Sequence, residues 1–336
     1  MYSYILSSVA IADTRGLRSR PVLNSTEQSD TRPAAVRVPL DRSKQAAEYL
    51  RSASGGVMGT LAHFWERLSL TPPLARDDLH LVAVTKKPAA PASINFTTAC
   101  GAMLYVPKAH RAEVLASSNE TAEALCDYLQ TWWDSNPAQK TTAVTAALPI
   151  PPLPINYVTG LAAGVKAMTP RLLNMVNRKA AARQTVNIMM TLPPDQPAPL
   201  CPKVRLARDG DEPVLHRWRK LYNQERGILF DADINAWIES RNVCVHESNG
   251  EIVALAKFDL ALTTTIEIGG VFTFPEYRKQ GFGGELVYDM ASRIRQMGKT
   301  PVLQVDAEND PALMLYQKMN WVELGRLARV WLNSAA

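Results

Sequence analysis

Hydrophobic and polar positions follow two different periodicities along the second part of the chain. In residues 211–226 the apolar positions recur every three or four residues, which predicts an amphipathic helix. Two strand-like runs, 242–247 and 252–260, flank an Asn-Gly step that is typical of a tight hairpin. The predicted elements lie at 203–207, 211–226, 231–241, 242–247, 252–260, 263–274, a helix ending near 297, then 301–307, 310–319 and 321–332. Their order, strand, two helices, three strands, helix, strand, helix and strand, predicts an α/β fold with a mixed β-sheet flanked by helices.

Two proline-rich stretches divide the chain. Consecutive prolines exclude a helix, so the first stretch, residues 148–157, is predicted to be extended. The second stretch, within residues 191–202, is predicted to be an interdomain linker. Residues 13–37 mix Arg, Ser, Thr and Pro, which leaves an organelle-targeting leader as the alternative to a disordered tail. The division that we predict is a tail at 1–34, an α/β domain at 35–190, a linker at 191–202 and a second domain at 203–336.

Composition narrows the class of protein. The chain is 46% hydrophobic and 21% charged, which is ordinary for a globular protein. No apolar run reaches the roughly 18 residues of a membrane-spanning helix, so no membrane partner is expected. Residues 1–200 hold 20 Lys and Arg against 14 Asp and Glu, and residues 201–336 hold 17 against 18. The basic residues are spread singly without interleaved aromatic residues, so we expect no nucleic-acid partner.

Cysteine and histidine positions indicate the compartment. The four cysteines form no CxxC pair, and the five histidines are equally scattered. We therefore predict a reducing, cytoplasmic location, no disulfide framework, and neither a zinc site nor any other metal centre. The cysteines are Cys100, Cys126, Cys201 and Cys244.

The segment PEYRKQGFGG, residues 275–284, carries the candidate chemistry. A glycine-rich turn between a strand and a helix points free backbone N–H groups at one place, where the helix dipole adds positive charge. The segment is either a flexible turn or a phosphate-binding loop. No Gly-Lys-Ser/Thr follows it, so it is not a P-loop, and its glycine spacing is not that of a dinucleotide fingerprint.

Two motifs in this context resemble the GNAT superfamily of acyl-CoA-dependent N-acyltransferases. The family carries Arg/Gln-x-x-Gly-x-Gly/Ala after its fourth strand, and this chain has Arg278 to Gly283 there. The later motif, an Asn after the fifth strand and then a helix with a Tyr, is matched by Asn309 and Tyr316. The resemblance covers about residues 203–332. One departure is Asn320-Trp321, where the family commonly has Gly-Phe.

The resemblance implies acetyl-CoA as co-substrate and direct transfer of its acetyl group to a primary amine in a ternary complex. It implies that the glycine-rich segment holds the pyrophosphate, and that a bulge near Gly269 and Gly270 exposes backbone to the pantetheine, with the Val271 amide as oxyanion donor. The implied cofactor-binding residues are Val271, Phe272, Thr273, Arg278, Lys279, Gln280, Gly281, Phe282, Gly283, Gly284, Asn309 and Tyr316.

Two residues take catalytic roles under this resemblance. Glu267 lies where several members carry a catalytic glutamate, and Tyr316 would be the general acid on the leaving thiol. Partial desolvation between Ile266 and Ile268 would raise the pKa of Glu267 and suit it to act as a base. Alternatives stay open: Glu267 lies on the exposed strand face with water as the base, and Tyr316 is a core residue.

The acceptor is expected to be an amine-bearing small molecule or a protein amine. The family builds its acceptor pocket from the two early helices, which here carry aromatic and acidic residues. The alternative is that the aromatic ones are core residues. The candidate substrate-binding residues are Trp218, Tyr222, Glu225, Phe230 and Trp237, with Asp231 and Asp233 nearby. We expect a monomer or a homodimer. The alternative function is a non-catalytic CoA-binding or scaffolding protein.

The first 200 residues carry no comparable motif. Residues 101–111 align with 269–279 at an offset of 168 positions, and both end a strand-like run with a proline. In this alignment Glu113 and Leu115 stand where Gly281 and Gly283 stand in the second copy. We therefore interpret 35–190 as a degenerate GNAT-like copy without a phosphate-binding loop, or as an unrelated α/β domain.

Overall fold

The computed structural model covers the whole chain but places only part of it in describable detail. The described residues are 32–59, 62, 65, 79–86, 90–91, 94–107, 110–135, 155–227, 233–262 and 264–332. Several residues of the sequence predictions lie outside them. They are Phe230, Asp231, residues 148–154 of the stretch predicted to be extended, and most of the predicted tail.

None of the helices in the described ranges has the length and apolar character that crossing a membrane requires.

Twelve strands of the described residues form one mixed sheet, which confirms the expected fold class. Its strand order is β1-β2-β3-β4-β5-β12-β6-β11-β10-β9-β8-β7. The first half contains β1 (Ala34–Val38), α1 (Ser43–Ala53), β2 (His80–Thr85), β3 (Ala99–Val106), β4 (Arg111–Ala116), α3 (Asn119–Asp134), β5 (Tyr157–Leu161), α5 (Ala162–Met175) and β6 (Arg183–Thr191). The second half contains β7 (Val204–Leu206), α6 (Glu212–Arg226), α7 (Ile234–Glu239), β8 (Val243–Ser248), β9 (Glu251–Ala261), β10 (Thr265–Thr273), α8 (Phe282–Gln296), β11 (Thr300–Asp306), α9 (Asp310–Lys318) and β12 (Val322–Trp331). Short 3₁₀ turns occupy Leu40–Arg42, Phe96–Thr98 and Pro275–Tyr277.

The two halves repeat one topology. In each half three antiparallel strands are followed by a helix and then by a strand that pairs in parallel with the third of them: β4 with β5, and β10 with β11. The equivalent of β10 is therefore β4, not β3. The sequence alignment of 101–111 with 269–279 places β3 opposite β10, and it is wrong because it follows a shared proline rather than the strand pairing.

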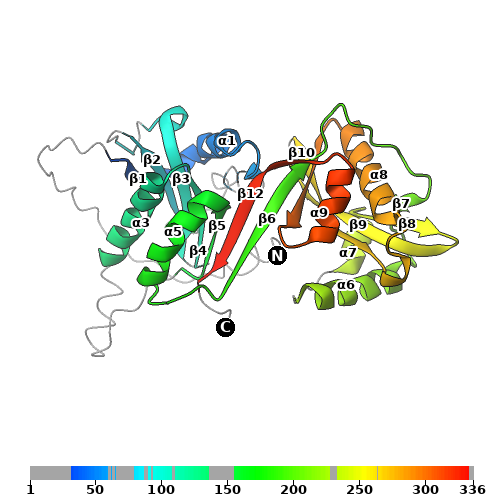
Figure 1. Cartoon of the computed structure of the whole chain (residues 1–336). Coiled ribbons are helices and arrows are strands. Elements are labelled where there is room, and N and C mark those ends of the chain that lie inside the picture. The colour runs from blue at the N-terminus through cyan, green and yellow to red at the C-terminus, as the bar shows by residue number, and fades with distance from the viewer. Residues whose placement is uncertain are drawn as a thin grey trace, which may run out of the picture.

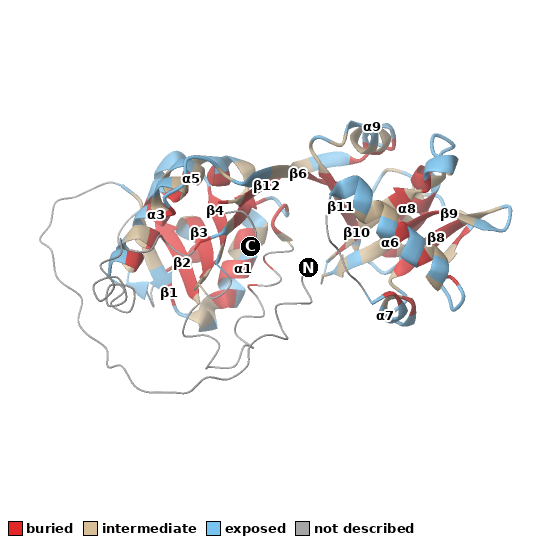
Figure 2. Ribbon diagram, turned by 90° about the horizontal axis from the view of Figure 1, so that it is seen from below, coloured by how far each residue is buried: buried red, intermediate tan, exposed pale blue. Residues whose placement is uncertain are grey.

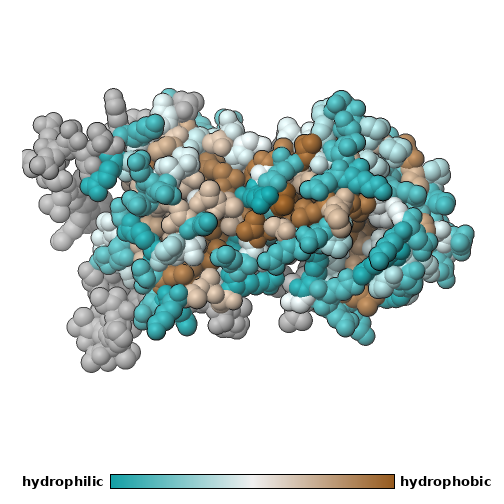
Figure 3. Space-filling view, in the orientation of Figure 1, coloured by the Kyte–Doolittle hydropathy of each residue, from teal (hydrophilic) through white to brown (hydrophobic). Residues whose placement is uncertain are grey.

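Each half receives its last strand from the other half. Strand β12 pairs with β5 of the first half, whereas β6 pairs with β11 of the second half, and β6 and β12 pair with each other. Figure 1 shows these two long strands side by side between the halves. Figure 3 shows apolar side chains gathered over the same middle region of this face. The sheet is therefore continuous, and neither half has its full set of strands in one stretch of sequence.

Helices cover both faces of the sheet, with buried strands between them (Figure 2). In the second half α8 packs on one face, where Leu286, Met290 and Ile294 are fully buried against β6, β10 and β11. Helices α6 and α7 pack on the other face through Trp218 and Ile234. This layering leaves the two faces of β10 with different neighbours, which decides where its side chains point.

The hairpin predicted from the Asn-Gly step is confirmed. Strands β8 and β9 pair antiparallel, with Ser248 opposite Glu251. Asn249 and Gly250 have φ values of 53° and 79°. This kind of two-residue hairpin turn requires a positive φ at both central positions. Asn-Gly favours this turn because glycine has no side chain to clash there.

The exchanged strand generates a prediction about fragments. A fragment starting at Arg183 keeps β6, whereas one starting at Lys203 loses the buried side chains of Ile188, Met190 and Leu192. Burying three such side chains is worth roughly 5 to 9 kcal/mol, which is comparable to the whole stability of a domain. We expect only the longer fragment to unfold cooperatively when it is heated and followed by circular dichroism. Both fragments lack β5, so both lose the pairing of β12 with that strand. Equal melting curves would contradict the role given to β6.

Candidate active site

The parallel strands β10 and β11 pair with each other along only part of their length. Their pairing runs from Thr265 opposite Thr300 to Ile268 opposite Leu303, although β10 continues to Thr273 and β11 to Asp306. Beyond that point β11 pairs only with β6 on its other side. Among the described residues, the β11-facing edge of β10 beyond Ile268 therefore has no ladder partner. Apart from the Thr273 carbonyl oxygen, which accepts a hydrogen bond from Arg278, its polar backbone groups are open to a ligand in extended conformation.

A bulge in β10 accompanies this divergence, as the two glycines predicted. Opposite β9 the register jumps from Gly269–Lys257 to Phe272–Leu255, so β10 has one residue too many between them. Gly270 has a φ of 62°, and a Cβ there would lie 3.1 Å from Cζ2 of Trp218. At Gly269 a Cβ would collide with the side chain of Asp259. Glycine is required at both positions because neighbouring side chains cover the bulge.

The segment after β10 forms the predicted loop with exposed amides. Within the described part of the chain, the backbone N–H groups of residues 279–283 have no hydrogen-bond acceptor. Gly281 is the N-cap of α8, with a φ of 89° and open space where a Cβ would be. Because the start of a helix also carries partial positive charge, the loop has the backbone geometry of an anion site.

The Arg278 side chain of the loop is engaged within the protein. Arg278 donates from Nε to the Thr273 carbonyl oxygen at 3.0 Å and from Nη2 to Glu225 Oε1 at 2.7 Å. These contacts tie the end of β10 to α6. The Phe282 ring packs against His246 instead of entering the loop, so only its backbone amide faces outward there.

Glu267 lies on the opposite face of β10 from α8, because its neighbours Ile266 and Ile268 are in the core beneath that helix. Gln304 Nε2 donates to Glu267 Oε2 at 3.3 Å, and Arg329 Nη2 in turn donates to Gln304 Oε1 at 2.8 Å. Burial, reinforced by the negative charge of Asp259, raises the pKa of Glu267 to about 7. The side chain therefore has the proton affinity of a base working at neutral pH.

Tyr316 belongs to α9, the helix that follows β11, and Asn309 is the N-cap of that helix. Tyr316 on α9 is 6% exposed, and burial raises its pKa well above the ordinary range of a tyrosine. Its hydroxyl therefore stays protonated, as a hydrogen-bond donor must. Asn309 caps α9, with its Oδ1 accepting from the Ala312 amide at 3.4 Å.

The aromatic residues expected in the acceptor pocket divide into two groups. Trp218 is 1% exposed and belongs to the core beneath α6, although its Nε1–H has no partner among the described residues. Tyr222 and Trp237 are partly buried and lie 5.6 Å from Trp218, measured between ring centroids. Glu225 is exposed and paired with Arg278. Phe230 lies outside the described residues.

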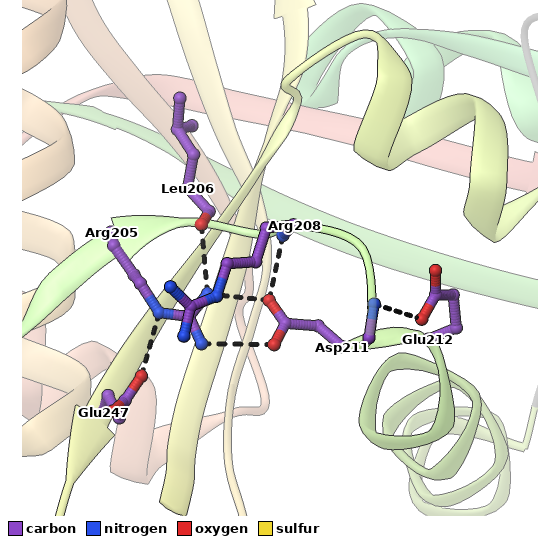
Figure 4. A network of polar contacts seen from close by, with 7 residues as sticks. Arg205, Leu206, Arg208, Asp211, Glu212 and Glu247 are labelled. Atoms are coloured by element: carbon purple, nitrogen blue, oxygen red, sulfur yellow. Dashed lines mark hydrogen bonds and ion pairs between the residues drawn. The ribbon is translucent and has the colours of Figure 1, made fainter. Parts of the chain in front are cut away.

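A polar network fixes the start of α6, the helix that carries Trp218 and Tyr222 (Figure 4). Arg205 on β7 donates to both carboxylate oxygens of Asp211, at 2.7 and 3.1 Å, and to Glu247 on β8 at 2.8 Å. Asp211 also accepts the Arg208 amide, and the pairing with Arg205 lowers its pKa in spite of partial burial. The two-pronged ion pair holds the helix against the edge of the sheet.

Sequence reasoning missed four polar residues around Glu267. Asp259 and Lys257 come from β9 and form an ion pair, and Lys257 Nζ lies 5.3 Å from the Trp237 ring centroid. Gln304 comes from β11 and Arg329 from β12. The available signal was the polar residue in each apolar strand, namely Gln304 in PVLQVDA and Arg329 in RLARVWL.

Residues 244–332 match the model of the FR47-like protein family. No curated protein matches the chain. The fold is similar to that of a solved protein from Drosophila, with a TM-score of 0.54 and 12% identity over 88% of this chain and 98% of that one. It is also similar to a GCN5-related N-acetyltransferase from Sphaerobacter thermophilus, with a TM-score of 0.50 and 16% identity over 90% of this chain and 97% of that one. A GNAT-family acetyltransferase from Colwellia psychrerythraea has a TM-score of 0.50 and 11% identity over 90% of this chain and 99% of that one.

The chain has a GNAT-like fold, and its residues 244–332 match the FR47-like family model. The matches cover 88% to 90% of the chain, so the likeness of fold includes the first half as well as the residues of the family model. At these identities it is the fold that is shared. The first half of this GNAT-like pair differs in its loop: β4 is followed by Ser117 and Ser118, and the Ser118 side chain accepts the Thr121 amide at the start of α3.

The elevated pKa of Glu267 predicts a pH-dependent stability. The unfolded chain ionises this carboxyl near pH 4.5, and the folded chain does so near pH 7. The folded state therefore binds more protons in this window, and stability falls as the pH rises through it, by at most about 3 kcal/mol. Glu267→Gln stays neutral, so we expect it to remove this fall and to be more stable than the wild type at pH 8.

Urea unfolding of both proteins at pH 5 and pH 8 measures the effect. Glu308→Gln, which changes an exposed carboxyl elsewhere, serves as control. If Glu267→Gln and the wild type lose the same stability between the two pH values, the carboxyl is not desolvated.

Proposed function

We propose that the second half of the chain is an acyl-CoA-dependent N-acyltransferase that moves an acetyl group from acetyl-CoA to a primary amine. The observation that carries the proposal is the combination of an unpaired backbone edge on β10 with the exposed amides of residues 279–283. The edge suits an extended, amide-bearing chain, and the amides suit a diphosphate. Coenzyme A joins these two chemical parts in one molecule.

The cofactor would run along this edge. The pyrophosphate binds the amides between Lys279 and Gly283, and Gly283 and Gly284 allow α8 to begin close behind it. The pantetheine arm takes the place of a strand beside Val271, Phe272 and Thr273, bonding their backbone groups. The thioester then lies at the bulge, where the Val271 amide can polarise its carbonyl oxygen.

Glu267 and Tyr316 supply the proton transfers. Glu267 takes the proton of the acceptor ammonium, directly or through a water, and the neutral amine attacks the thioester carbonyl carbon. When the resulting tetrahedral intermediate collapses, the carbon–sulfur bond breaks and Tyr316 protonates the departing thiolate. Both residues regain their resting state by exchange with solvent. The reaction proceeds by direct transfer in a ternary complex, without an acyl-enzyme.

The acceptor side is acidic and aromatic. Asp259 and Glu267 lie close enough for the first to raise the pKa of the second, and Tyr222 and Trp237 line the same face of the sheet. A cationic amine gains from the Glu267 carboxylate. The cations already over both rings, Arg226 over Tyr222 and Lys257 over Trp237, indicate that these rings accept such a group. We therefore propose an ammonium-bearing acceptor, small or on a protein, as the substrate class.

The first half would not bind the cofactor. Its equivalent loop is short and has no glycine, and the first turn of α3 is already capped by Ser118. We propose that one coenzyme A binds per chain, in the second half alone.

The loop geometry predicts how glycine substitutions affect binding. Gly281→Val and Gly283→Val place a branched side chain where the diphosphate approaches the amides, so we expect each to weaken binding of acetyl-CoA at least tenfold. Isothermal titration calorimetry measures both the affinity and the stoichiometry, which we expect to be one.

Gly298→Val is the matched control, because Gly298 also has a positive φ of 70° with open space at its Cβ position but lies beyond the far end of α8. It should suffer similar backbone strain and keep its affinity. Equal affinities in all three variants would place the cofactor elsewhere, and two equivalents bound per chain would contradict the assignment of the first half.

The proton-transfer roles predict different pH profiles. Glu267→Gln cannot accept a proton, so turnover should fall by about 10²- to 10⁴-fold at neutral pH and the acid limb near pH 7 should disappear. Tyr316→Phe should lower turnover at every accessible pH and keep the acid limb, because burial moves the tyrosine titration out of range. Release of free thiol from acetyl-CoA with a panel of primary amines measures both.

Two variants outside the site separate these effects from general damage. Glu308→Gln and Tyr288→Phe remove a carboxylate and a hydroxyl at a distance, and both should turn over normally. Near-normal turnover of Glu267→Gln would assign the base to water. Cofactor binding without turnover on any amine would instead favour a non-catalytic CoA-binding protein.

A further inference from the structure

Three side chains that are far apart in the sequence converge on one point outside the candidate active site. Cys201 precedes β7, His246 lies on β8 and Glu285 is in the first turn of α8. Cys201 Sγ is 3.9 Å from His246 Nε2 and 3.6 Å from Glu285 Oε2, and the latter two atoms are 2.7 Å apart. A thiol, an imidazole nitrogen and a carboxylate oxygen thus face one another. Scattered positions in the sequence had predicted that no such group exists.

The surrounding structure holds the first of these ligands in place. The Cys201 amide donates to Oδ2 of Asp289, a fully buried residue of α8, at 2.9 Å. Arg293 binds the carbonyl oxygen of Val204 at 3.1 Å, and Arg295 binds that of Gln196 at 2.6 Å. Hydrogen bonds therefore hold the segment from Gln196 to Val204 against α8 on both sides of Cys201.

The histidine is fixed by burial. The His246 side chain is 0% exposed and its ring packs on that of Phe282, with centroids 5.0 Å apart. Its Nδ1 is buried and has no partner among the described residues. Only Nε2 meets the other two groups, so the ring presents one nitrogen to the cluster.

This arrangement is not that of a nucleophilic triad. In a triad the nucleophile and the orienting carboxylate bind opposite nitrogens of the imidazole. Here Cys201 and Glu285 both approach Nε2. Convergence of three donor atoms on one point is instead the arrangement of ligands around a cation.

The separations fit a tetrahedral zinc ion. With the usual bond lengths, zinc holds S, N and O ligands about 3.4 to 3.6 Å from one another. Two of the three separations here lie within 0.3 Å of that range. The third, between His246 and Glu285, is shorter because a hydrogen bond joins them, and the Glu285 side chain is 50% exposed and free to turn aside.

We propose that Cys201, His246 and Glu285 bind a divalent zinc ion, with a water or a small anion at the fourth position. On binding, the thiol loses its proton to solvent and the ion replaces the hydrogen bond between His246 and Glu285. Sulfur, nitrogen and carboxylate ligands together favour zinc over magnesium or calcium, which prefer oxygen alone. The half-exposed Glu285 leaves the fourth position open to solvent.

Such an ion would join the proline-rich segment, β8 and α8 at one point. The absence of a partner for His246 Nδ1 sets a limit on affinity, since removing such outer hydrogen bonds typically weakens metal binding by 10- to 100-fold. We therefore expect a single site weaker than a closed structural zinc site. The assignment is tested independently of the acyltransferase proposal, because its test requires neither coenzyme A nor turnover.

Cobalt provides the spectroscopic test. The full-length protein is freed of metal with a chelator and titrated with Co²⁺, and we expect one equivalent to produce a thiolate-to-cobalt charge-transfer band together with the intense visible bands of tetrahedral cobalt. Zinc should abolish both signals on addition of one equivalent. Calorimetry with zinc alone then gives the affinity and stoichiometry.

Variants identify the ligands. Cys201→Ala should lose the charge-transfer band, and Glu285→Gln should keep it while binding zinc at least tenfold more weakly; circular dichroism checks that both are folded. Cys100→Ala, which removes another half-buried thiol outside the cluster, should behave as the wild type. The proposal is overturned if the wild type shows no charge-transfer band, or if folded Cys201→Ala retains it, or if Glu285→Gln binds zinc unchanged.

Discussion

The separation of β10 from β11 is the constraint on which the candidate site depends. Two parallel strands normally bond along their shared length, and here they do so only as far as Ile268 and Leu303. The bulge at Gly269 to Val271 turns β10 away, while β6 holds β11 on its other side. Beyond Leu303, β6 is the strand that keeps β11 in the sheet. The open edge therefore depends on a strand supplied by the first half of the chain.

The exchange of β6 and β12 also explains why a half without a glycine-rich loop is part of the same fold. The core of the first half contains Leu327, Ala328 and Val330 from β12, and that of the second half contains Ile188 and Met190 from β6. Each core is completed by side chains of the other half. Strand β12 also brings Arg329 to Gln304, and hence to Glu267, so the exchange contributes to the electrostatics of the site.

Local signals were enough to predict the elements of the second half, its hairpin, its bulge and its loop, because each rests on a few neighbouring residues such as Asn249-Gly250 or Gly269-Gly270. Pairing between distant strands was not predictable in this way. The pattern of β6 is equally suited to either half, and a shared proline misled the internal alignment. The polar surroundings of Glu267 come from β9, β11 and β12, and the cluster of Cys201, His246 and Glu285 joins residues 39 to 84 positions apart. Such contacts exist only once the topology is known.

The start of α8 links the two proposed sites electrostatically. Its amides form the proposed anion-binding end of the loop, and Glu285 places a carboxylate within the same first turn. A negative charge near a helix N-terminus stabilises the helix but repels a diphosphate bound to the preceding amides. His246 shares that carboxylate by a hydrogen bond, and a cation held between them would neutralise it. Occupancy of the cluster by zinc should therefore favour, not oppose, an anion at residues 279–283, so the two sites are coupled through one turn of helix.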